Sequence, residues 1–276
     1  MIKKTVFLLL ISLHAFTSTK VLLWDLGGVL FQPDKIGVAR EIGLKHFVSY
    51  MLVDWKSPNI ESLLFSVLEH MEKPESGIRE KAGTGEGVPL PTIMCHWQAG
   101  TVTGPEIIKR AGPHIKLLAN MDYFESSFEK SLIEKTISAM FDPKILARNV
   151  QPIKAGMELL KDCVNARNKD GTKRNRIIAF SNWDPLSFDI FHKQNAKHFK
   201  HFEHIIISGH IGLIKPRAES YHYVLKKLNL KPQDCILIDD QKINAIGAQR
   251  CGIKTLLVED GNYEMVRDDL KMLGAL

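Results

Sequence analysis

Cysteine is scarce in this chain. Four of its 276 residues are cysteines, and no two of them are spaced as a Cys-x-x-Cys pair. A chain of this length builds a hydrophobic core without covalent cross-links, so no disulfide framework is needed. We therefore expect four free thiols, most of them buried. They are Cys95, Cys163, Cys235 and Cys251.

Dense runs of basic residues are also absent. The formal net charge is +6, from 37 Lys and Arg against 31 Asp and Glu, but the basic residues do not gather into an arm that would bind nucleic acid. The excess of positive charge favours small anionic ligands instead. With 45% hydrophobic residues, the chain can form one large domain with an insertion or two modest domains.

No apolar run near the N-terminus is long enough to span a bilayer comfortably. Residues 5–16 are mostly apolar, follow Lys3 and Lys4, and are followed by small residues, which is the layout of a secretory signal. We predict a signal peptide over residues 1–19 and a secreted or periplasmic protein with no membrane anchor after cleavage. The alternative is a cytoplasmic protein in which residues 5–13 form a first core strand or helix.

Short apolar runs alternate with amphipathic stretches from residue 153 onward. The runs read RIIAF, HIII, CILI and KTLLV, and an earlier run, VLLW, ends at Trp24. Because each run is apolar throughout, it is typical of a parallel strand whose two faces are both covered. The pattern predicts a doubly wound, Rossmann-like α/β fold with a parallel sheet. The core of this fold would comprise residues 20–32 and 151–276.

The intervening residues, 33–150, have a different pattern. Their apolar residues recur at helical spacing in four stretches, with no convincing strand among them. Residues 72–91 are rich in glycine, proline and charge, which predicts a connecting loop. We therefore expect an inserted all-α cap domain interrupted by one long loop.

Polar residues follow the predicted strands at the points where the apolar runs end. The carboxyl ends of parallel strands lie along one edge of a sheet, and ligands bind in the crevice beyond that edge. Each of these residues alone could be a helix cap or a surface group, but their joint placement favours a site. They are Asp25, Ser181, Asn182, Lys215, Asp239 and Asp240.

This set of groups suits phosphoryl transfer. A carboxylate can attack phosphorus and form an aspartyl-phosphate. A hard divalent cation held by carboxylates screens the charges that would keep the nucleophile from the phosphate. A hydroxyl and an ammonium group can then hold the phosphoryl oxygens. Two adjacent acids, Asp239 and Asp240, repel each other unless a cation or hydrogen-bond donors lie between them.

Four motifs in this order resemble those of the haloacid dehalogenase superfamily, in the branch with a helical cap inserted after the first motif. They are WDLGGVLF, AFSNWD, GLIKP and ILIDDQKINAIGAQRCG. The resemblance implies that Asp25 is the catalytic nucleophile and that Ser181 and Lys215 bind the transferring phosphoryl group. It also implies a Mg²⁺ cofactor held by Asp25 and Asp240, with support from Asp239.

Further polar and glycine positions complete the expected site. Gly27 and Gly28 would let backbone groups approach the cation and the phosphate closely, with the Gly27 carbonyl as a metal ligand. Asn182 is expected to take part in substrate binding beside Ser181. Asn244 stands where relatives often place another polar or acidic residue, and its role stays open.

Gly27 also departs from the pattern of the family. Most phosphatases of this superfamily carry at this position a second Asp that acts as acid and base, and glycine cannot transfer a proton. The sequence predicts a magnesium-dependent phosphatase that hydrolyses a small phosphorylated metabolite through an aspartyl-phosphate. It leaves open which group replaces the missing acid. Two alternatives remain: a metal-independent hydrolase of the haloacid dehalogenase type, and a binding protein of the same fold with weakened catalysis.

Overall fold

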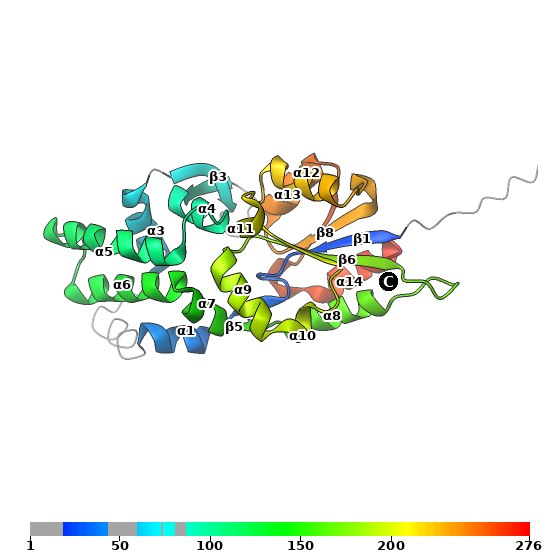
Figure 1. Ribbon diagram of the computed structural model, residues 1–276, viewed down its shortest axis with the longest axis horizontal. Helices are drawn as coiled ribbons and strands as arrows, with labels where there is room; N and C mark the ends of the chain where they lie inside the picture. The colour runs from blue at the N-terminus through cyan, green and yellow to red at the C-terminus, as the bar shows by residue number, and fades with distance from the viewer. Residues whose placement is uncertain (1–18, 44–59, 73, 81–86) are drawn as a thin grey trace, which may run out of the picture.

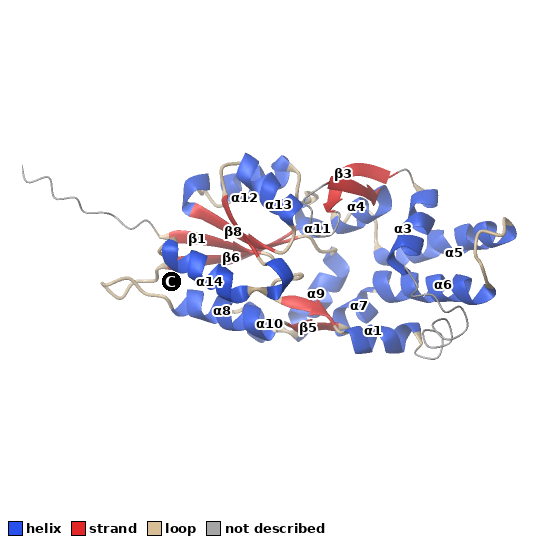
Figure 2. Cartoon of the chain, turned by 180° about the vertical axis from the view of Figure 1, so that it is seen from behind, coloured by secondary structure: helices blue, strands red, loops and turns tan. Residues whose placement is uncertain are grey.

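The structure is a computed structural model that describes residues 19–43, 60–72, 74–80 and 87–276. Its two halves lie side by side along the long axis: a sheet covered by helices, and a mainly helical part (Figures 1 and 2). All but the last residue of the predicted signal peptide lies outside the described residues. Among the helices that the structure describes, none is both long and apolar enough to cross a membrane.

The central sheet contains five parallel strands. They are β1 (Lys20–Trp24), β6 (Asn175–Ser181), β7 (His204–Ile207), β8 (Cys235–Asp239) and β9 (Lys254–Leu257). Their order across the sheet is β7-β6-β1-β8-β9, and each pair of neighbours is parallel. In the centre, Leu22 lies opposite Ile177 on one side and Ile236 on the other. The five strands predicted from apolar runs, and their parallel arrangement, are confirmed.

Helices cover both faces of this sheet. They are α8 (Lys154–Asn165), α9 (Pro185–Gln194), α10 (Ala196–Phe199), α11 (Ser208–Ile211), α12 (Ala218–Lys227), α13 (Lys242–Arg250) and α14 (Tyr263–Met272). Within β1, Leu22 and Trp24 join a core that includes α8, α9 and α14, whereas Val21 and Leu23 join one that includes α12 and α13. Figure 1 shows these two helical layers on opposite sides of the sheet. This is the doubly wound, Rossmann-like fold that the sequence predicts.

The second half of the molecule consists mainly of helices. They are α1 (Lys35–Ile42), α3 (Ile60–Met71), α4 (Thr92–Gln98), α5 (Gly104–Asn120), α6 (Ser127–Phe141) and α7 (Pro143–Arg148). Buried residues such as Ile107 and Ile137 form a separate apolar core between these helices. The side chains of Thr103 and Ser126 cap α5 and α6 by accepting from backbone N–H groups in the first turn. The helical character of this half is as expected.

The expectation that this half contains no strand is wrong. β3 (Pro74–Glu80) and β4 (Gly87–Pro91) form an antiparallel hairpin within the segment that was expected to be a loop. Pro74 pairs with Pro91 at the open end, and Pro89 falls where the pairing is irregular. The prolines, which have no backbone N–H, thus lie where the hairpin does not need a regular ladder of hydrogen bonds. In the sequence, the glycines and prolines of residues 72–91 obscure the strand pattern.

A short two-stranded sheet joins the halves. β2 (Phe31–Pro33) and β5 (Val150–Pro152) are antiparallel because the chain leaves the sheet half along β2 and returns along β5. The expected domain boundaries, at residues 32/33 and 150/151, fall inside this pair. This sheet lies directly after the loop that carries Asp25 and fixes where the insertion begins.

The cysteines are free thiols in this structure. Cys95, Cys163 and Cys235 are buried, and Cys251 is half-buried. Burial raises the pKa of the thiols of Cys163 and Cys235 to about 12. Because the thiolate is the reactive form, these two residues are expected to react slowly in the folded protein.

Candidate active site

Three loops meet at the carboxyl edge of the sheet, directly after β1, β6 and β8. β1 lies between β6 and β8, so Asp25 stands between Ser181 at the end of β6 and Asp239 at the end of β8. The N–H of Asp25 donates to the carbonyl of Ile238 at 2.9 Å, which continues the strand pairing one residue past β1. The structure thus brings together residues that are more than 200 positions apart in the chain. Ser181 is buried, and its hydroxyl makes a hydrogen bond with the Asp25 carboxylate.

Lys215 connects two of the acids. Its Nζ lies 2.6 Å from Oδ2 of Asp239 and 3.2 Å from Oδ2 of Asp25. Burial alone would lower the pKa of Lys215, but the Asp239 and Asp25 carboxylates raise it, so the side chain is charged. Asn182 holds the lysine backbone from both sides: its Nδ2 donates to the Lys215 carbonyl at 2.8 Å, and its Oδ1 accepts from the Lys215 N–H at 2.9 Å. Asn182 therefore positions Lys215 from the neighbouring loop.

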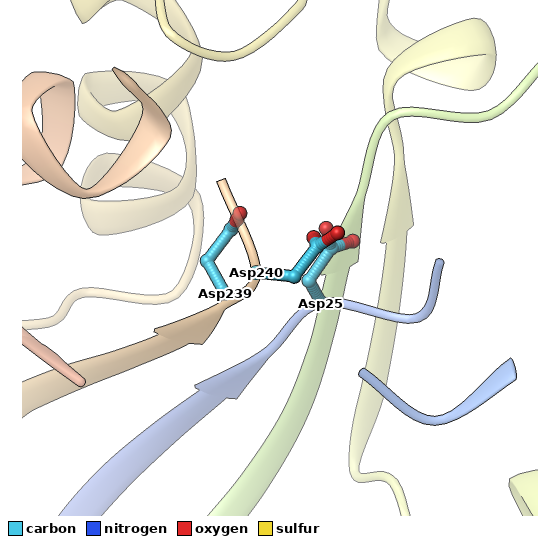
Figure 3. A group of neighbouring side chains, drawn as sticks. All are labelled: Asp25, Asp239 and Asp240. Atoms are coloured by element: carbon cyan, nitrogen blue, oxygen red, sulfur yellow. The ribbon is translucent and has the colours of Figure 1, made fainter. Parts of the chain in front are cut away.

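Asp239 is saturated with hydrogen-bond donors. Beyond Lys215, its Oδ1 accepts from the N–H of Gln241 at 2.9 Å and from Nδ2 of Asn244 at 3.1 Å. The side chain is fully buried. Figure 3 shows its carboxylate turned away from those of Asp25 and Asp240. Asn244, whose role the sequence leaves open, thus orients Asp239, and Asp239 holds Lys215.

Asp25 and Asp240 face each other. Figure 3 shows their carboxylates side by side. Burial is the largest cause that raises the pKa of Asp25 to about 6, with Lys215 acting in the opposite direction. Burial, followed by the charges of Asp25 and Asp239, raises the pKa of Asp240 to about 8. Two carboxylates held this close favour a positive charge between them.

The residues present fit a hard divalent cation. Oδ1 of Asp240 is buried and has no hydrogen-bond partner. Asp25, Asp239 and Asp240 each offer an oxygen, and these atoms lie within 4.8 Å of one another. In the described part of the chain, this is the only such group of acidic, histidine or cysteine ligands. Because oxygen ligands suit Mg²⁺ and the oxygens of Asp239 are already engaged, Asp25 and Asp240 are the better candidate ligands.

The two glycines after Asp25 differ in what they are needed for. Gly28 has a φ of +73°, and a Cβ on it would lie 2.0 Å from Oδ2 of Asp240, so only glycine fits there. Its N–H donates to the Phe31 carbonyl at 2.8 Å, inside the loop itself. At Gly27, in contrast, a Cβ would meet no atom within 4 Å. Packing therefore requires Gly28 but does not require Gly27.

Ser208 links the two halves beside this site, and the sequence analysis missed it. Its buried Oγ donates to the Gln98 carbonyl at 2.6 Å and accepts from the N–H of Trp183 at 3.0 Å. Close by, a Cβ on Gly100 would lie 2.3 Å from the Gly209 carbonyl oxygen, so the two backbones touch. Ser208 directly follows β7, so the rule that polar residues after strands gather at one edge could have identified it.

A known protein family matches the part of the chain that contributes several of these site residues. A family model described as haloacid dehalogenase-like hydrolase matches residues 188–258, which contain Lys215, Asp239 and Asp240. Over these residues the chain is similar to haloacid dehalogenase-like hydrolases, which supports the resemblance predicted from the sequence. The match does not extend to the first motif of the superfamily around Asp25, which the structure places beside the matched residues.

Solved structures of this superfamily share the fold. A haloacid dehalogenase family enzyme of Bacteroides thetaiotaomicron, a mutant in complex with magnesium and inorganic phosphate, has a TM-score of 0.52 at 18% identity. The similarity covers 88% of this chain and 95% of that chain. Another structure of that enzyme also has a TM-score of 0.52, at 17% identity, and covers 89% and 98%. At this identity the likeness supports the architecture of both halves and nothing finer.

Curated relatives match shorter stretches. Bifunctional epoxide hydrolase 2 of Rattus norvegicus is 29% identical over 127 residues, which is 45% of this chain and 22% of that protein. Glyceraldehyde 3-phosphate phosphatase of Pyrococcus furiosus is 36% identical over 63 residues, which is 22% of this chain and 26% of that protein. The chain thus spans about a quarter of the length of these relatives.

Proposed function

We propose that this protein is a magnesium-dependent phosphatase that hydrolyses a small phosphorylated metabolite through an aspartyl-phosphate on Asp25. One observation carries the proposal: the Asp25 and Asp240 carboxylates meet at the sheet edge, and Nζ of Lys215 lies 3.2 Å from Oδ2 of Asp25. A nucleophile, a cation site and a fixed positive charge are then within reach of one phosphoryl group. Phosphatases among the curated relatives support this reading.

The proposed reaction has two displacements. In the first, a carboxylate oxygen of Asp25 attacks phosphorus, an O–P bond forms, and the bond to the leaving-group oxygen breaks. In the second, water attacks the same phosphorus, inorganic phosphate leaves, and the Asp25 carboxylate is restored. The N–H of Leu26 donates to Oδ1 of Asp25 at 2.7 Å and fixes the orientation of the nucleophile for both steps.

The surrounding residues bind and neutralise the phosphoryl group. Ser181 and Lys215 would hold its oxygens as charge shifts between them. Asn182 and Asp239 act through Lys215, since they fix its backbone and its Nζ. Asp25, Asp240 and the Gly27 carbonyl would hold Mg²⁺, which neutralises negative charge on nucleophile and phosphate when bound.

The alternative functions fit the site less well. A metal-independent hydrolase that attacks a neutral carbon has no use for the unpartnered, buried Oδ1 of Asp240. A binding protein has no need for a nucleophile and an ammonium group in contact, as Asp25 and Lys215 are. The geometry therefore favours the phosphatase.

The test is hydrolysis of p-nitrophenyl phosphate by the purified protein. We expect activity with Mg²⁺, loss of it with a chelator, and recovery when Mg²⁺ is restored. Asp240→Asn should raise the Mg²⁺ concentration needed, whereas Glu264→Gln, a change at an exposed acid on α14, should not. Metal-independent release of halide from a haloacid would support the dehalogenase. Binding of Mg²⁺ and phosphate without any turnover would support the binding protein.

Two further proposals concern the inserted helical half and the N-terminal segment. We propose that residues 33–150 act as a cap that selects the substrate, and that residues 1–19 direct export to the periplasm or the exterior. N-terminal sequencing of the native protein should then begin between Thr17 and Val21. An intact Met1 in the cytosolic fraction would contradict the export proposal.

A further inference from the structure

Departure of the leaving group is the step for which the described residues provide no proton. The charged groups that act on the Asp25 carboxylate in the described part of the chain are Lys215, Asp239 and Asp240. Lys215 is held by two carboxylates, at 2.6 and 3.2 Å. Both oxygens of Asp239 accept hydrogen bonds, and Asp240 faces Asp25 as the candidate metal ligand. None of these groups is free to protonate a departing oxygen.

The hydroxyl groups around the site are engaged as well. Ser181 bonds to the nucleophile itself. The hydroxyl of Tyr221 donates to the Asn244 carbonyl at 2.7 Å, and that of Tyr263 donates to the Val29 carbonyl at 2.6 Å. These contacts tie both phenols to the loops that support the site. They leave neither phenol available for proton transfer.

Position 27 lies in the same loop as Asp25 and has room for a side chain. Gly27 is exposed, lies two residues after Asp25, and has no atom within 4 Å of where a Cβ would be. The neighbouring Gly28 is imposed by the contact with Asp240, but nothing comparable imposes Gly27. Among the described residues, the space at position 27 is therefore open, and it carries no acid two residues after the proposed nucleophile.

We propose that this site takes phosphoryl groups whose leaving group is an acidic hydroxyl, namely phosphate esters of phenols and enols and mixed anhydrides with carboxylic acids. It would discriminate against phosphate esters of ordinary alcohols. This inference rests on the proposed function and narrows its substrate class. It follows from the open, acid-free position at Gly27 together with the engaged state of Lys215 and Asp239.

Cleavage of the P–O bond can proceed without a proton donor only when the leaving group is an acidic hydroxyl. Attack by Asp25 forms one O–P bond, and the bonding electron pair of the broken P–O bond leaves with the departing oxygen. A carboxylate, a phenolate or an enolate is a much weaker base than an alkoxide and can leave with that pair before it is protonated, whereas an alkoxide must be protonated as it leaves. A positioned acid is worth about 10²–10⁴-fold in rate. We expect alkyl esters to be slower than aryl esters by about that factor.

The experiment compares ring-substituted phenyl phosphates with ethyl phosphate, all at saturating Mg²⁺. Substituents on the ring change the pKa of the leaving group with little change in shape. The quantity to measure is kcat/KM, because it reports the steps up to P–O cleavage, whereas kcat also includes attack of water on the aspartyl-phosphate. We expect kcat/KM to fall steeply as the leaving-group pKa rises, and to be about 10²–10⁴-fold lower for ethyl phosphate than for p-nitrophenyl phosphate.

Gly27→Asp and Gly27→Asn form the matched pair of variants. They add nearly the same volume at an open position, but only Asp can carry a proton to the leaving group. We expect Gly27→Asp to flatten the dependence on leaving-group pKa and to raise the rate for ethyl phosphate relative to p-nitrophenyl phosphate by at least about 10-fold. Gly27→Asn should keep the steep dependence of the unmodified protein.

The outcomes separate this inference from the proposed function. A flat series in the unmodified protein would overturn the substrate class and leave the phosphatase standing, because it would mean that another group supplies the proton. Equal slopes in the Asp and Asn variants would overturn the role given to position 27. No hydrolysis of p-nitrophenyl phosphate or acetyl phosphate with Mg²⁺ would overturn both. The series on the unmodified protein decides the matter even if neither variant folds.

Discussion

The sheet half and the helical half of this protein differ in how directly their sequence patterns correspond to structure. In the sheet half, each apolar run forms a strand, and the polar residues at the ends of β1, β6 and β8 reach the site. In the helical half, the helices lie where the apolar spacing places them, but the β3–β4 hairpin has no recognisable strand pattern. In the sheet half, the order of the parallel strands determines which residues meet at the site. The position of the helical half depends instead on contacts between residues far apart in the chain, such as Ser208 with Gln98.

Replacement of Asp25, the proposed nucleophile, should separate the roles of the two halves most clearly. Asp25→Asn should lower phosphatase activity on the order of 10⁴-fold or more, because an amide cannot form the aspartyl-phosphate. Asp25 lies in the loop directly after β1, outside the helices of the other half, so the circular dichroism spectrum should change little. The measurement is steady-state kinetics with Mg²⁺. Activity within 10-fold of the unmodified protein would contradict the role of Asp25.

Removal of the Lys215 ammonium group should affect stability as well as catalysis. Lys215→Ala leaves the buried carboxylates of Asp25 and Asp239 without their shared partner. Breaking a buried ion pair in this way costs about 3–5 kcal/mol of the free energy of unfolding. Urea denaturation should show the loss in the sheet half. Lys227→Ala, a change at a basic residue of α12 that contacts the Tyr223 hydroxyl, is the matched control and should cost at most about 1 kcal/mol.

Disruption of the contact between the halves should act on substrate binding more than on chemistry. Gly100 has a φ of +72°, and a Cβ there would lie 2.3 Å from the Gly209 carbonyl oxygen. Gly100→Ala should therefore cost about 1–3 kcal/mol and raise KM more than it lowers kcat. Gly171→Ala, also at positive φ but with open space around it, controls for backbone strain alone. An equal effect of the two variants on KM would argue against a functional contact at Gly100.

The smallest expected effect is a gain in stability. In the absence of metal, the raised pKa of Asp240, about 8 against an ordinary 3.8, means that the folded state loses stability as the pH rises between these values. Asp240→Asn removes that cost, so at neutral pH the metal-free variant should melt at least about 2–4 °C higher than the unmodified protein. At the same concentration, Mg²⁺ should raise the melting temperature of the unmodified protein more than that of the variant. A lower melting temperature for the metal-free variant would contradict the repulsion between Asp25 and Asp240.

Several features could be predicted from the sequence alone, and their physical reason is local. The runs VLLW, RIIAF and CILI are apolar on both faces, which is compatible with buried parallel strands and with little else. Once the strands are parallel, Asp25, Ser181 and Asp239 must lie along one edge. The helices of the second half follow in the same way from their apolar spacing and from caps such as Ser126.

Other features were decided only by the tertiary structure, because they depend on which side chains meet across the fold. Asp239 and Asp240 are adjacent and chemically identical in the sequence, yet one binds Lys215 and the other faces Asp25. Gly27 and Gly28 are equally indistinguishable, but only Gly28 lies against a carboxylate. The hairpin β3–β4 and the link from Ser208 to Gln98 likewise depend on partners elsewhere in the chain. Local periodicity carries no information about such partners. They are brought together by the order of the strands in the sheet and by the packing of one half against the other.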